Sequence, residues 1–391
     1  MEPNNPLDTK LQHFRSQFPH TLRNIRYFNH AAQSPLARVT VDAINDHLGE
    51  RHDGMMMTFP KDVKFIHQCR DRIRELIQAP DTGRITFIGN TSEGLNRVTS
   101  GLEWHDGDEI ILNSMEFPAN VYPYRKLESR GVKCTVVDAG DGTVPVDRIA
   151  SAITPKTRMI AISAVQFLSG YRADLPAIGE LCRKHDLWFV VDGIQAAGVM
   201  PLKLEKWGVD AFSTGGHKWL MAPTGIGFLY LSEKLNRELK TPDPGWLSVE
   251  EPWDLFRHNQ LLKTDATRYE GGVLNIPGIY GLNASIGLLL ETGIDRIRDH
   301  VLSCTEKLRQ GLINTGLEPF TTGHRMHLSG IMTFHLPEDM EYDGLEKTFQ
   351  ERGIYLSIRN GKIRFAPHGY NTFDEIANVI SETESICSKR T

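Results

Sequence analysis

The sequence predicts an α/β protein, in which a large domain with a mostly parallel sheet is followed by a smaller α+β domain. From residue 84 onwards, apolar segments of strand length alternate with segments of helical length, which is typical of parallel sheets covered by helices. The apolar run LWFVV ends at Asp192, and open α/β sheets bind their ligands at such strand ends. Lys218 follows a Gly-Gly turn shortly afterwards, in front of a second apolar run.

Length and composition limit the class of protein. At 391 residues the chain exceeds one ordinary core, so we expect two domains. Forty per cent hydrophobic and 24% charged residues fit a soluble globular protein, and a formal net charge of −5 favours neither nucleic acid nor an anionic membrane as a partner. The sequence has no apolar run of membrane-helix length and no hydrophobic signal core, so we expect a cytoplasmic protein. The five cysteines have neither CxxC nor metal-ligand spacing, which predicts reduced thiols and no metal site.

The alternating pattern of the large domain can be followed segment by segment. The expected strands are residues 84–88, 108–112, 132–137, 158–163, 187–192 and 225–231. The expected helices are residues 91–101, 118–130, 146–153 and 175–185. Three prolines among charged residues then predict a loop-rich excursion over residues 233–268.

The remaining segments lie on either side of this pattern. We expect helices over residues 37–51, 62–79, 276–290 and 293–316 and from residues 342 and 372, with strands near 329–335, 355–358 and 362–365. The methionines at 55, 56 and 57 are expected to lie in a loop or to fill packing gaps. The large domain is expected to span residues 60–265, and the small domain to combine residues 1–59 with 266–391.

Two features point to a cofactor. Lys218 stands among apolar residues, where an amine loses charge stabilisation and becomes a nucleophile; together with Asp192 it suits a carbonyl cofactor that has a protonatable ring nitrogen. The segment GNTSEG, residues 89–94, joins a strand to a helix, and hydroxyl and N–H groups at a helix N-terminus form an anion site. A simple N-cap is the alternative explanation of this segment, because Ser and Thr are preferred there.

Several motifs, together with their order and separation along the chain, resemble those of the class V aminotransferase and cysteine desulfurase group of fold-type I pyridoxal phosphate enzymes. The matching segments are NTSEG, Asp192 with Gln195, Gly216-His217-Lys218, RYFNHAAQSPL, RYEGGVLNIPGI and IRFAPHGYNT. The resemblance covers nearly the whole chain. It implies the fold-type I transferase fold with a mostly parallel seven-stranded sheet, pyridoxal 5'-phosphate as cofactor, and a homodimer with its sites at the interface.

The resemblance also implies roles for individual residues. Lys218 would form the internal aldimine and Asp192 would pair with the pyridine nitrogen, which keeps the ring an electron sink. The other implied cofactor contacts are Gln195 to the ring oxygen, His217 to the phosphate, and Thr91, Ser92 and Thr214 in the phosphate site. Thr214 stands one residue before Gly215, where a phosphate-binding serine is common, and Val273 replaces a threonine that often reaches the partner's phosphate.

Substrate contacts follow from the same resemblance. Arg364 matches the arginine that binds the substrate carboxylate, a task suited to the two parallel N–H groups of a guanidinium. Asn29 and His30 are further substrate-side candidates. Arg172 is a candidate second anchor, and a salt bridge to Asp174 or a neighbour is an equal alternative.

Two departures from the desulfurase pattern affect the expected reaction. Phe117 occupies the place of the histidine above the cofactor ring; it can stack on the ring but cannot shuttle a proton. Residues 337–364, where desulfurases carry their catalytic cysteine, contain no cysteine. We therefore expect an aminotransferase-like enzyme, also because EFPANVYPY resembles the aminotransferase branch.

Other functions remain open. A carbon-sulfur β-lyase needs no catalytic cysteine, and an epimerase of the isopenicillin-N-epimerase kind uses the same first steps. A non-catalytic protein that keeps the fold is a further alternative, although Lys218, Asp192 and Arg364 argue against it. The side chain of the substrate does not follow from the sequence.

Overall fold

A seven-stranded sheet forms the centre of the computed structural model, which describes residues 7–55, 59–241, 243–321, 325–338 and 340–387. Its strands are β2 (Ile85–Ile88), β3 (Glu109–Asn113), β4 (Lys133–Val137), β5 (Thr157–Ser163), β6 (Trp188–Asp192), β7 (Ala211–Gly215) and β8 (Gly227–Leu231). They lie in the order β2-β8-β7-β6-β5-β3-β4, and only β8 is antiparallel to its neighbours. The expected mostly parallel seven-stranded sheet is confirmed.

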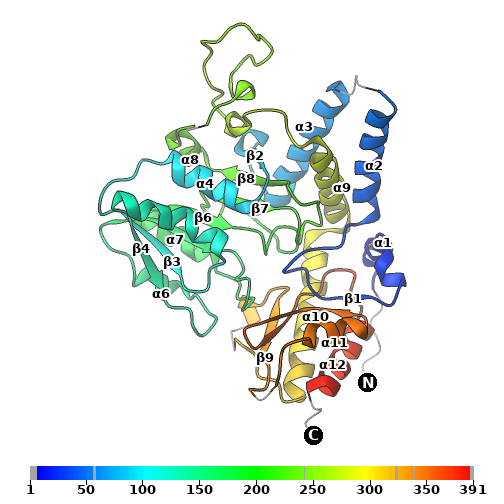
Figure 1. Cartoon of the computed structure of the whole chain (residues 1–391). Coiled ribbons are helices and arrows are strands. Elements are labelled where there is room, and N and C mark those ends of the chain that lie inside the picture. The colour runs from blue at the N-terminus through cyan, green and yellow to red at the C-terminus, as the bar shows by residue number, and fades with distance from the viewer. Residues whose placement is uncertain (1–6, 56–58, 242, 322–324, 339, 388–391) are drawn as a thin grey trace.

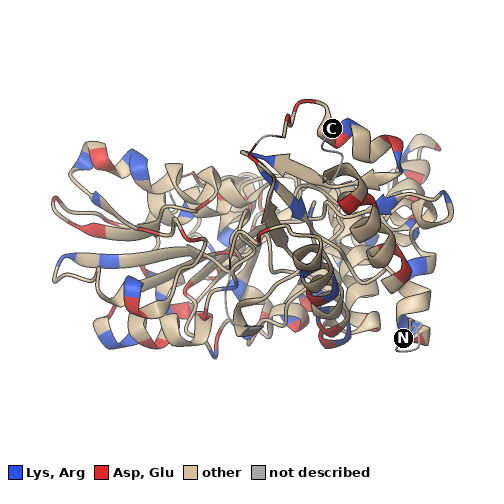
Figure 2. Ribbon diagram, turned by 90° about the horizontal axis from the view of Figure 1, so that it is seen from below, with Lys and Arg blue, Asp and Glu red and all other residues tan. Residues whose placement is uncertain are grey.

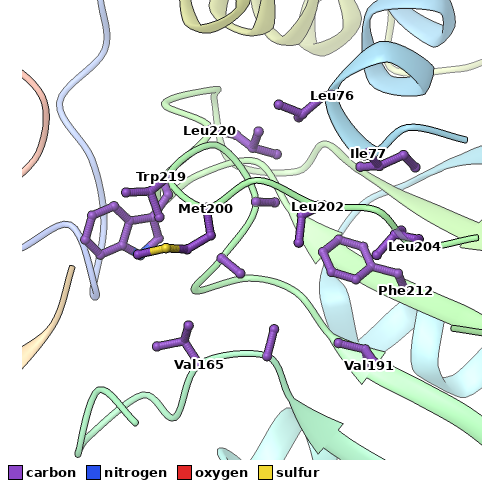
Figure 3. Close-up of a cluster of buried hydrophobic side chains, with 14 of the residues drawn as sticks. Leu76, Ile77, Val165, Val191, Met200, Leu202, Leu204, Phe212, Trp219 and Leu220 are labelled. Carbon is purple, nitrogen blue, oxygen red and sulfur yellow. The ribbon is translucent and has the colours of Figure 1, made fainter. Parts of the chain in front are cut away.

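A helix follows most strands of the large sheet, as the alternating pattern predicts (Figure 1). These helices are α4 (Thr91–Gly101), α5 (Tyr122–Arg125), α6 (Val146–Ala150), α7 (Leu175–His185) and α8 (Glu233–Glu238). Three longer helices, α2 (Arg38–His52), α3 (Phe59–Ile77) and α9 (Ile276–Thr292), pack together at one side of the molecule (Figure 1). Buried side chains from α3, such as Leu76 and Ile77, meet Leu202, Leu204 and Leu220 in the main core (Figure 3).

A second, smaller sheet lies below the large one in Figure 1. Strands β9 (Met332–His335), β11 (Ser357–Arg359) and β12 (Lys362–Phe365) form an antiparallel sheet, and β1 (Arg26–Tyr27) pairs with β10 (Ile354–Tyr355). Helices α1 (Thr9–Ser16), α10 (Ile294–Asn314), α11 (Leu345–Glu351) and α12 (Phe373–Cys387) complete this part. The β1–β10 pair joins the N-terminal segment to the C-terminal third, and the domain boundaries at residues 60 and 265 stay a prediction.

Several elements differ from the expectation, and α1 and α8 have no counterpart among the expected helices. The segment 118–130 is a series of short turns around α5 instead of one helix, because Pro118 and Pro123 lack the N–H groups that a continuous helix requires. Strand β7 has no counterpart among the expected strands, because its Ser213 and Thr214 interrupt the apolar pattern; both are nevertheless buried. Met55 is exposed in a loop, whereas Met56 and Met57 lie outside the described residues.

The surface carries charges of both signs. Basic and acidic residues are mixed along the helices in both halves of the molecule (Figure 2). Among the described residues, no helix is long and apolar enough to cross a membrane.

Candidate active site

A cavity of about 320 Å³ lies where the carboxyl ends of the parallel strands meet. Strands β2, β3, β5, β6 and β7 all end at this edge of the sheet, which is where α/β sheets place their ligands. The antiparallel sheet closes the cavity from the other side with residues from β11 and β12. The polar and aromatic residues of its wall are Asn90, Thr91, Ser92, Phe117, Phe167, Asp192, His217, Lys218, Arg359 and Arg364.

Lys218 lies in the turn after β7 and points into this cavity. Its side chain is only 8% exposed, and its Nζ lies 5.6 Å from the centroid of the Phe117 ring. Burial lowers the pKa of Lys218 to about 8; Asp192 opposes the shift, whereas Arg364 and Arg359 add to it. Roughly a tenth of this amine is therefore neutral at pH 7, far more than for an ordinary lysine, and a nucleophile or a base requires the neutral form.

Asp192 ends β6 and forms the floor of the cavity. Its Oδ1 accepts a hydrogen bond of 2.9 Å from the amide of Ile194, which fixes the carboxylate at the strand end. Burial and, to a smaller extent, the nearby Glu116 carboxylate raise the pKa of Asp192 to about 7, against the lowering effects of the Ile194 amide and Lys218. A cation placed against this carboxylate, such as a protonated ring nitrogen, would restore its charge.

The N-terminus of α4 forms one wall. The Asn90 side chain caps the helix by accepting from the Glu93 amide at 3.0 Å, and Thr91 Oγ1 accepts from the Gly215 amide at 3.0 Å. The helix comes this close to β7 because Gly94 has no side chain; a Cβ atom there would lie 2.3 Å from Ser213 Oγ. The Thr91 hydroxyl thus holds the helix in place, the Glu93 amide is used by the Asn90 cap, and the amides of Thr91 and Ser92 with the Ser92 hydroxyl are left for an anion.

Arg364 projects from β12 and is 2% exposed. Its Nη1 donates to the Phe167 carbonyl at 2.6 Å, whereas Nε and Nη2 have no hydrogen-bond partner among the described residues. Burial lowers the pKa of Arg364 to about 10, and Arg359 adds to this effect. A buried guanidinium with two unused donors matches a bidentate carboxylate.

The structure does not bring Gln195 or Thr214 to the cavity wall. Gln195 Nε2 donates to the Ala31 carbonyl at 3.0 Å, and its Oε1 accepts from the Trp219 indole at 2.7 Å. The Thr214 hydroxyl donates to the Gly215 carbonyl at 3.1 Å and is fully buried. Their expected cofactor contacts therefore stay predictions.

His30 and Asn29 also lie outside the cavity wall. His30 is completely buried in an aromatic cluster, where its Nε2 lies 2.6 Å from the Tyr370 hydroxyl and its ring packs near Trp219 and His368. Asn29 forms a bridge to Ala366, and its Oδ1 is buried with no partner among the described residues. Ala31 and Ala32, which follow, are the residues of this segment that line the cavity.

Arg172 lies in a different cavity. Its side chain donates to the Met326 carbonyl, and the surrounding walls are mostly apolar and include Met200 and Trp207. Its backbone forms a bridge with Val165, which turns this segment away from the carboxyl ends of β6 and β7. The structure thus places Arg172 away from the wall that carries Lys218, its role as a second substrate anchor stays a prediction, and no ion pair with Asp174 is found among the described residues.

Two residues of the site escaped the sequence interpretation. Arg359 lines the cavity beside Arg364, and its role is visible only once β11 and β12 pair. Glu116 is buried below the cavity floor and accepts hydrogen bonds from residues on three segments. Its position inside EFPAN, next to Phe117, is the sequence feature that indicates a place near the site.

The residues of this cavity fit pyridoxal phosphate. A buried lysine that makes no hydrogen bond through Nζ within the described residues, a strand-end carboxylate, a helix N-terminus and a flat aromatic ring stand around one space. Lys218 would hold the carbonyl carbon, Asp192 the ring nitrogen, and Ser92 with the α4 amides the phosphate. No residue of the wall conflicts with this arrangement.

Comparisons with known proteins agree with this geometry. A family model for class-V aminotransferases matches residues 26–367. A probable cysteine desulfurase of Methanothermobacter thermautotrophicus is 28% identical over 93% of this chain and 94% of its own. An uncharacterized aminotransferase, YcbU of Bacillus subtilis, is 26% identical over 95% of this chain and 96% of its own.

Solved structures show the same fold. The apo cysteine desulfurase of Thermococcus onnurineus NA1 superposes with a TM-score of 0.88 at 23% identity, covering 98% of this chain and 99% of its own. The cystine C-S lyase C-DES, in complex with its product cysteine persulfide, gives 0.85 at 26% identity, over 94% and 99%. The expected fold type and cofactor are confirmed. The chain therefore belongs to the aminotransferase class-V family and is a pyridoxal-phosphate-dependent enzyme of fold type I.

Proposed function

We propose that this enzyme is a carbon-sulfur β-lyase that acts on cystine or a closely related amino acid. The similar proteins named as cysteine desulfurases and as a cystine C-S lyase favour this alternative over the aminotransferase-like activity that the sequence suggested first. One observation carries the choice within this group. The cavity wall presents a lysine and two arginines but no cysteine thiol.

The five cysteines, all within the described residues, lie away from the cavity wall. Cys69, Cys182 and Cys304 are buried in packing positions, and burial raises the pKa of each thiol. Cys134 and Cys387 are half-buried on β4 and α12. A reaction that transfers sulfur to an enzyme cysteine has no thiol here to receive it, whereas β-elimination requires none.

The residues of the cavity divide the reaction between them. Bound pyridoxal phosphate supplies a carbonyl for the substrate amine and a ring that takes up the electron pair of the broken Cα–H bond. Arg364 binds the α-carboxylate, Lys218 accepts the Cα proton, and the Cβ–S bond then breaks. With one water molecule, cystine would give cysteine persulfide, pyruvate and ammonia, so atoms and electrons balance.

The second arginine favours cystine among possible substrates. Cystine has two carboxylates, and Arg359 stands on the cavity wall beside Arg364. Its Nε donates only to Ser357 Oγ, at 3.2 Å, which leaves the Nη groups for a distal anion. The exposed Phe117 edge contributes an apolar surface for the methylene and sulfur atoms.

The test incubates the holoenzyme with cystine and follows pyruvate and persulfide together. We expect equal amounts of both, and we expect the double variant Cys134→Ser, Cys387→Ser to behave as wild type. Conversion of the cofactor to its amine form without pyruvate would instead support transamination, for which the similarity to YcbU is the supporting observation. Loss of persulfide formation in the cysteine variant would contradict the lyase proposal.

We also propose a homodimer. The loop between α8 and α9 projects from the molecule (Figure 1) and exposes large apolar side chains, which are Trp253, Leu255, Phe256 and Leu261. Phe256 is 92% exposed. Clusters of exposed apolar side chains on a globular protein mark interaction sites, and a second copy of this chain is the partner that the family resemblance implies.

A further inference from the structure

We propose that Glu116 is a positioning residue, which fixes the distance between the aromatic wall at Phe117 and the anion-binding Arg364. The inference rests on the proposed function to the extent that Arg364 binds a substrate carboxylate. Glu116 is not part of the cavity wall, and it acts through the two loops that it joins.

The Glu116 carboxylate has an unusual number of donors. Oε1 accepts from Asn113 Nδ2 at 2.6 Å, from the Ser163 amide at 2.8 Å and from Gln166 Nε2 at 2.9 Å. Oε2 accepts from Asn120 Nδ2 at 2.9 Å and from the Ser163 hydroxyl at 2.5 Å. The carboxylate is 7% exposed, and no cation pairs with it among the described residues. All five donors are neutral, so they can solvate a buried carboxylate but do not cancel its charge.

These donors belong to two different loops of the cavity. Asn113 and Asn120 flank the turn after β3 that carries Phe117, whereas Ser163 ends β5 and Gln166 precedes Phe167. Glu116 therefore ties the β3 loop to the β5 loop directly below the cavity. Neither loop is held to the other by a ladder hydrogen bond beyond the strand ends.

The connection continues to the substrate side. The rings of Phe117 and Phe167 meet edge to face, with centroids 5.2 Å apart, and the Phe167 carbonyl accepts from Arg364 Nη1 at 2.6 Å. A shift of the β5 loop would thus move Arg364, and a shift of the β3 loop would move the Phe117 ring, which is expected to face the cofactor. One carboxylate determines both positions.

A purely structural glutamate would affect folding alone, so the test must separate folding from geometry. The readout is the apparent affinity of the holoenzyme for glycine, which has a carboxylate, relative to methylamine, which has none; both are measured through the visible spectrum. Glu116→Gln keeps the size of the side chain but turns at least one acceptor into a donor. We expect it to weaken glycine binding relative to methylamine by about tenfold, the loss typical of a disturbed charge-assisted contact.

The matched control is Glu109→Gln. Glu109 lies at the other end of β3, is equally buried at 7%, and accepts from Thr154 Oγ1 at 2.7 Å, far from the cavity. We expect its ratio of glycine to methylamine affinity to stay within about twofold of wild type. Thermal unfolding of both variants measures the structural contribution.

A second variant keeps the proposal testable if Glu116→Gln does not fold. Gln166→Met removes one of the three hydrogen bonds that Glu116 accepts from the β5 loop and leaves the two from Ser163, and we expect a selective loss for glycine in the same direction. The proposal would be overturned if the ratio of glycine to methylamine affinity were unchanged in the folded variants. It would also be overturned if Glu109→Gln lowered this ratio equally. Because glycine and methylamine need no lyase chemistry, this result is independent of whether cystine is the substrate.

Discussion

Replacing Arg364 by methionine should lower the activity of the enzyme and leave its stability unchanged or higher. Methionine fills a similar space with an unbranched apolar side chain, so the packing around β12 should survive. The guanidinium is buried, and two of its donor nitrogens have no partner among the described residues. In the free enzyme this charge is a cost, and it becomes useful only when an anion arrives.

The magnitudes follow from the local contacts. The lowering of the pKa of Arg364 from 12.5 to about 10 corresponds to about 3 kcal/mol of lost ion solvation. The variant recovers this cost but loses the hydrogen bond to the Phe167 carbonyl, worth about 1 kcal/mol. We expect the free energy of unfolding of the variant to lie between the wild-type value and about 2 kcal/mol above it. The lost carboxylate contacts, roughly 1.5–3 kcal/mol each, should reduce kcat/KM by about 10² to 10⁴.

Steady-state assays with cystine and thermal unfolding of the same preparations test this reasoning. Arg172→Met is the matched control, since Arg172 is a partly buried arginine that donates to a carbonyl but faces another cavity. Its kcat/KM should stay within about twofold of wild type. A large loss of stability in Arg364→Met, with kcat/KM reduced only in proportion to the folded fraction, would refute the carboxylate-binding role.

Three further predictions follow from the same site. Lys218→Ala should abolish the borohydride-sensitive visible band of the holoenzyme, and a band that persists would show that another amine holds the cofactor. The rate at which apo protein captures pyridoxal phosphate should rise with pH up to about 8 and level off above it, because only the neutral Lys218 amine reacts. Arg359→Gln removes a positive charge that lowers the pKa of Lys218, so the pH profile of this variant should move to higher pH. An unmoved profile would contradict this coupling. Phe256→Asp should shift the protein from dimer to monomer in light scattering, with the exposed Lys234→Asp as control, and a monomeric wild type would exclude the proposed homodimer.

Local patterns were sufficient for most of the fold. The apolar runs at 187–192 and 225–231 correspond to β6 and β8, because both strands lie inside the sheet and are buried on both faces, which makes them continuously apolar whether they run parallel or antiparallel to their neighbours. Strand β7 was missed for the converse reason. Its Ser213 and Thr214 are buried by contacts with α4 and their own backbone, such as Ser213 Oγ to the Thr91 carbonyl at 2.8 Å, which no local pattern contains.

The site was predictable where a residue follows a strand end, and less so where its orientation depends on distant segments. Asp192, Lys218 and Phe117 follow β6, β7 and β3, so the shared edge of the sheet brings them together. Arg172 also follows a strand, but its bridge to Val165 turns it to another cavity. Glu116 collects its donors across a separation of 50 residues, and only the folded chain shows this.

The charges of the cavity link substrate binding to the proton affinity of Lys218. In the free site, burial lowers the pKa of this amine, and Arg364 and Arg359 lower it further against the opposing effect of Asp192. A carboxylate bound to Arg364 cancels part of the positive field, so the pKa of Lys218 must rise when the substrate is in place. With the roles proposed above, the amine would be poised to attack before binding and would be a stronger base once a Cα proton has to be removed. An amine substrate without a carboxylate leaves the positive charges of the two arginines without a counter-charge. The enzyme should therefore show a lower kcat as well as a lower affinity for such a substrate.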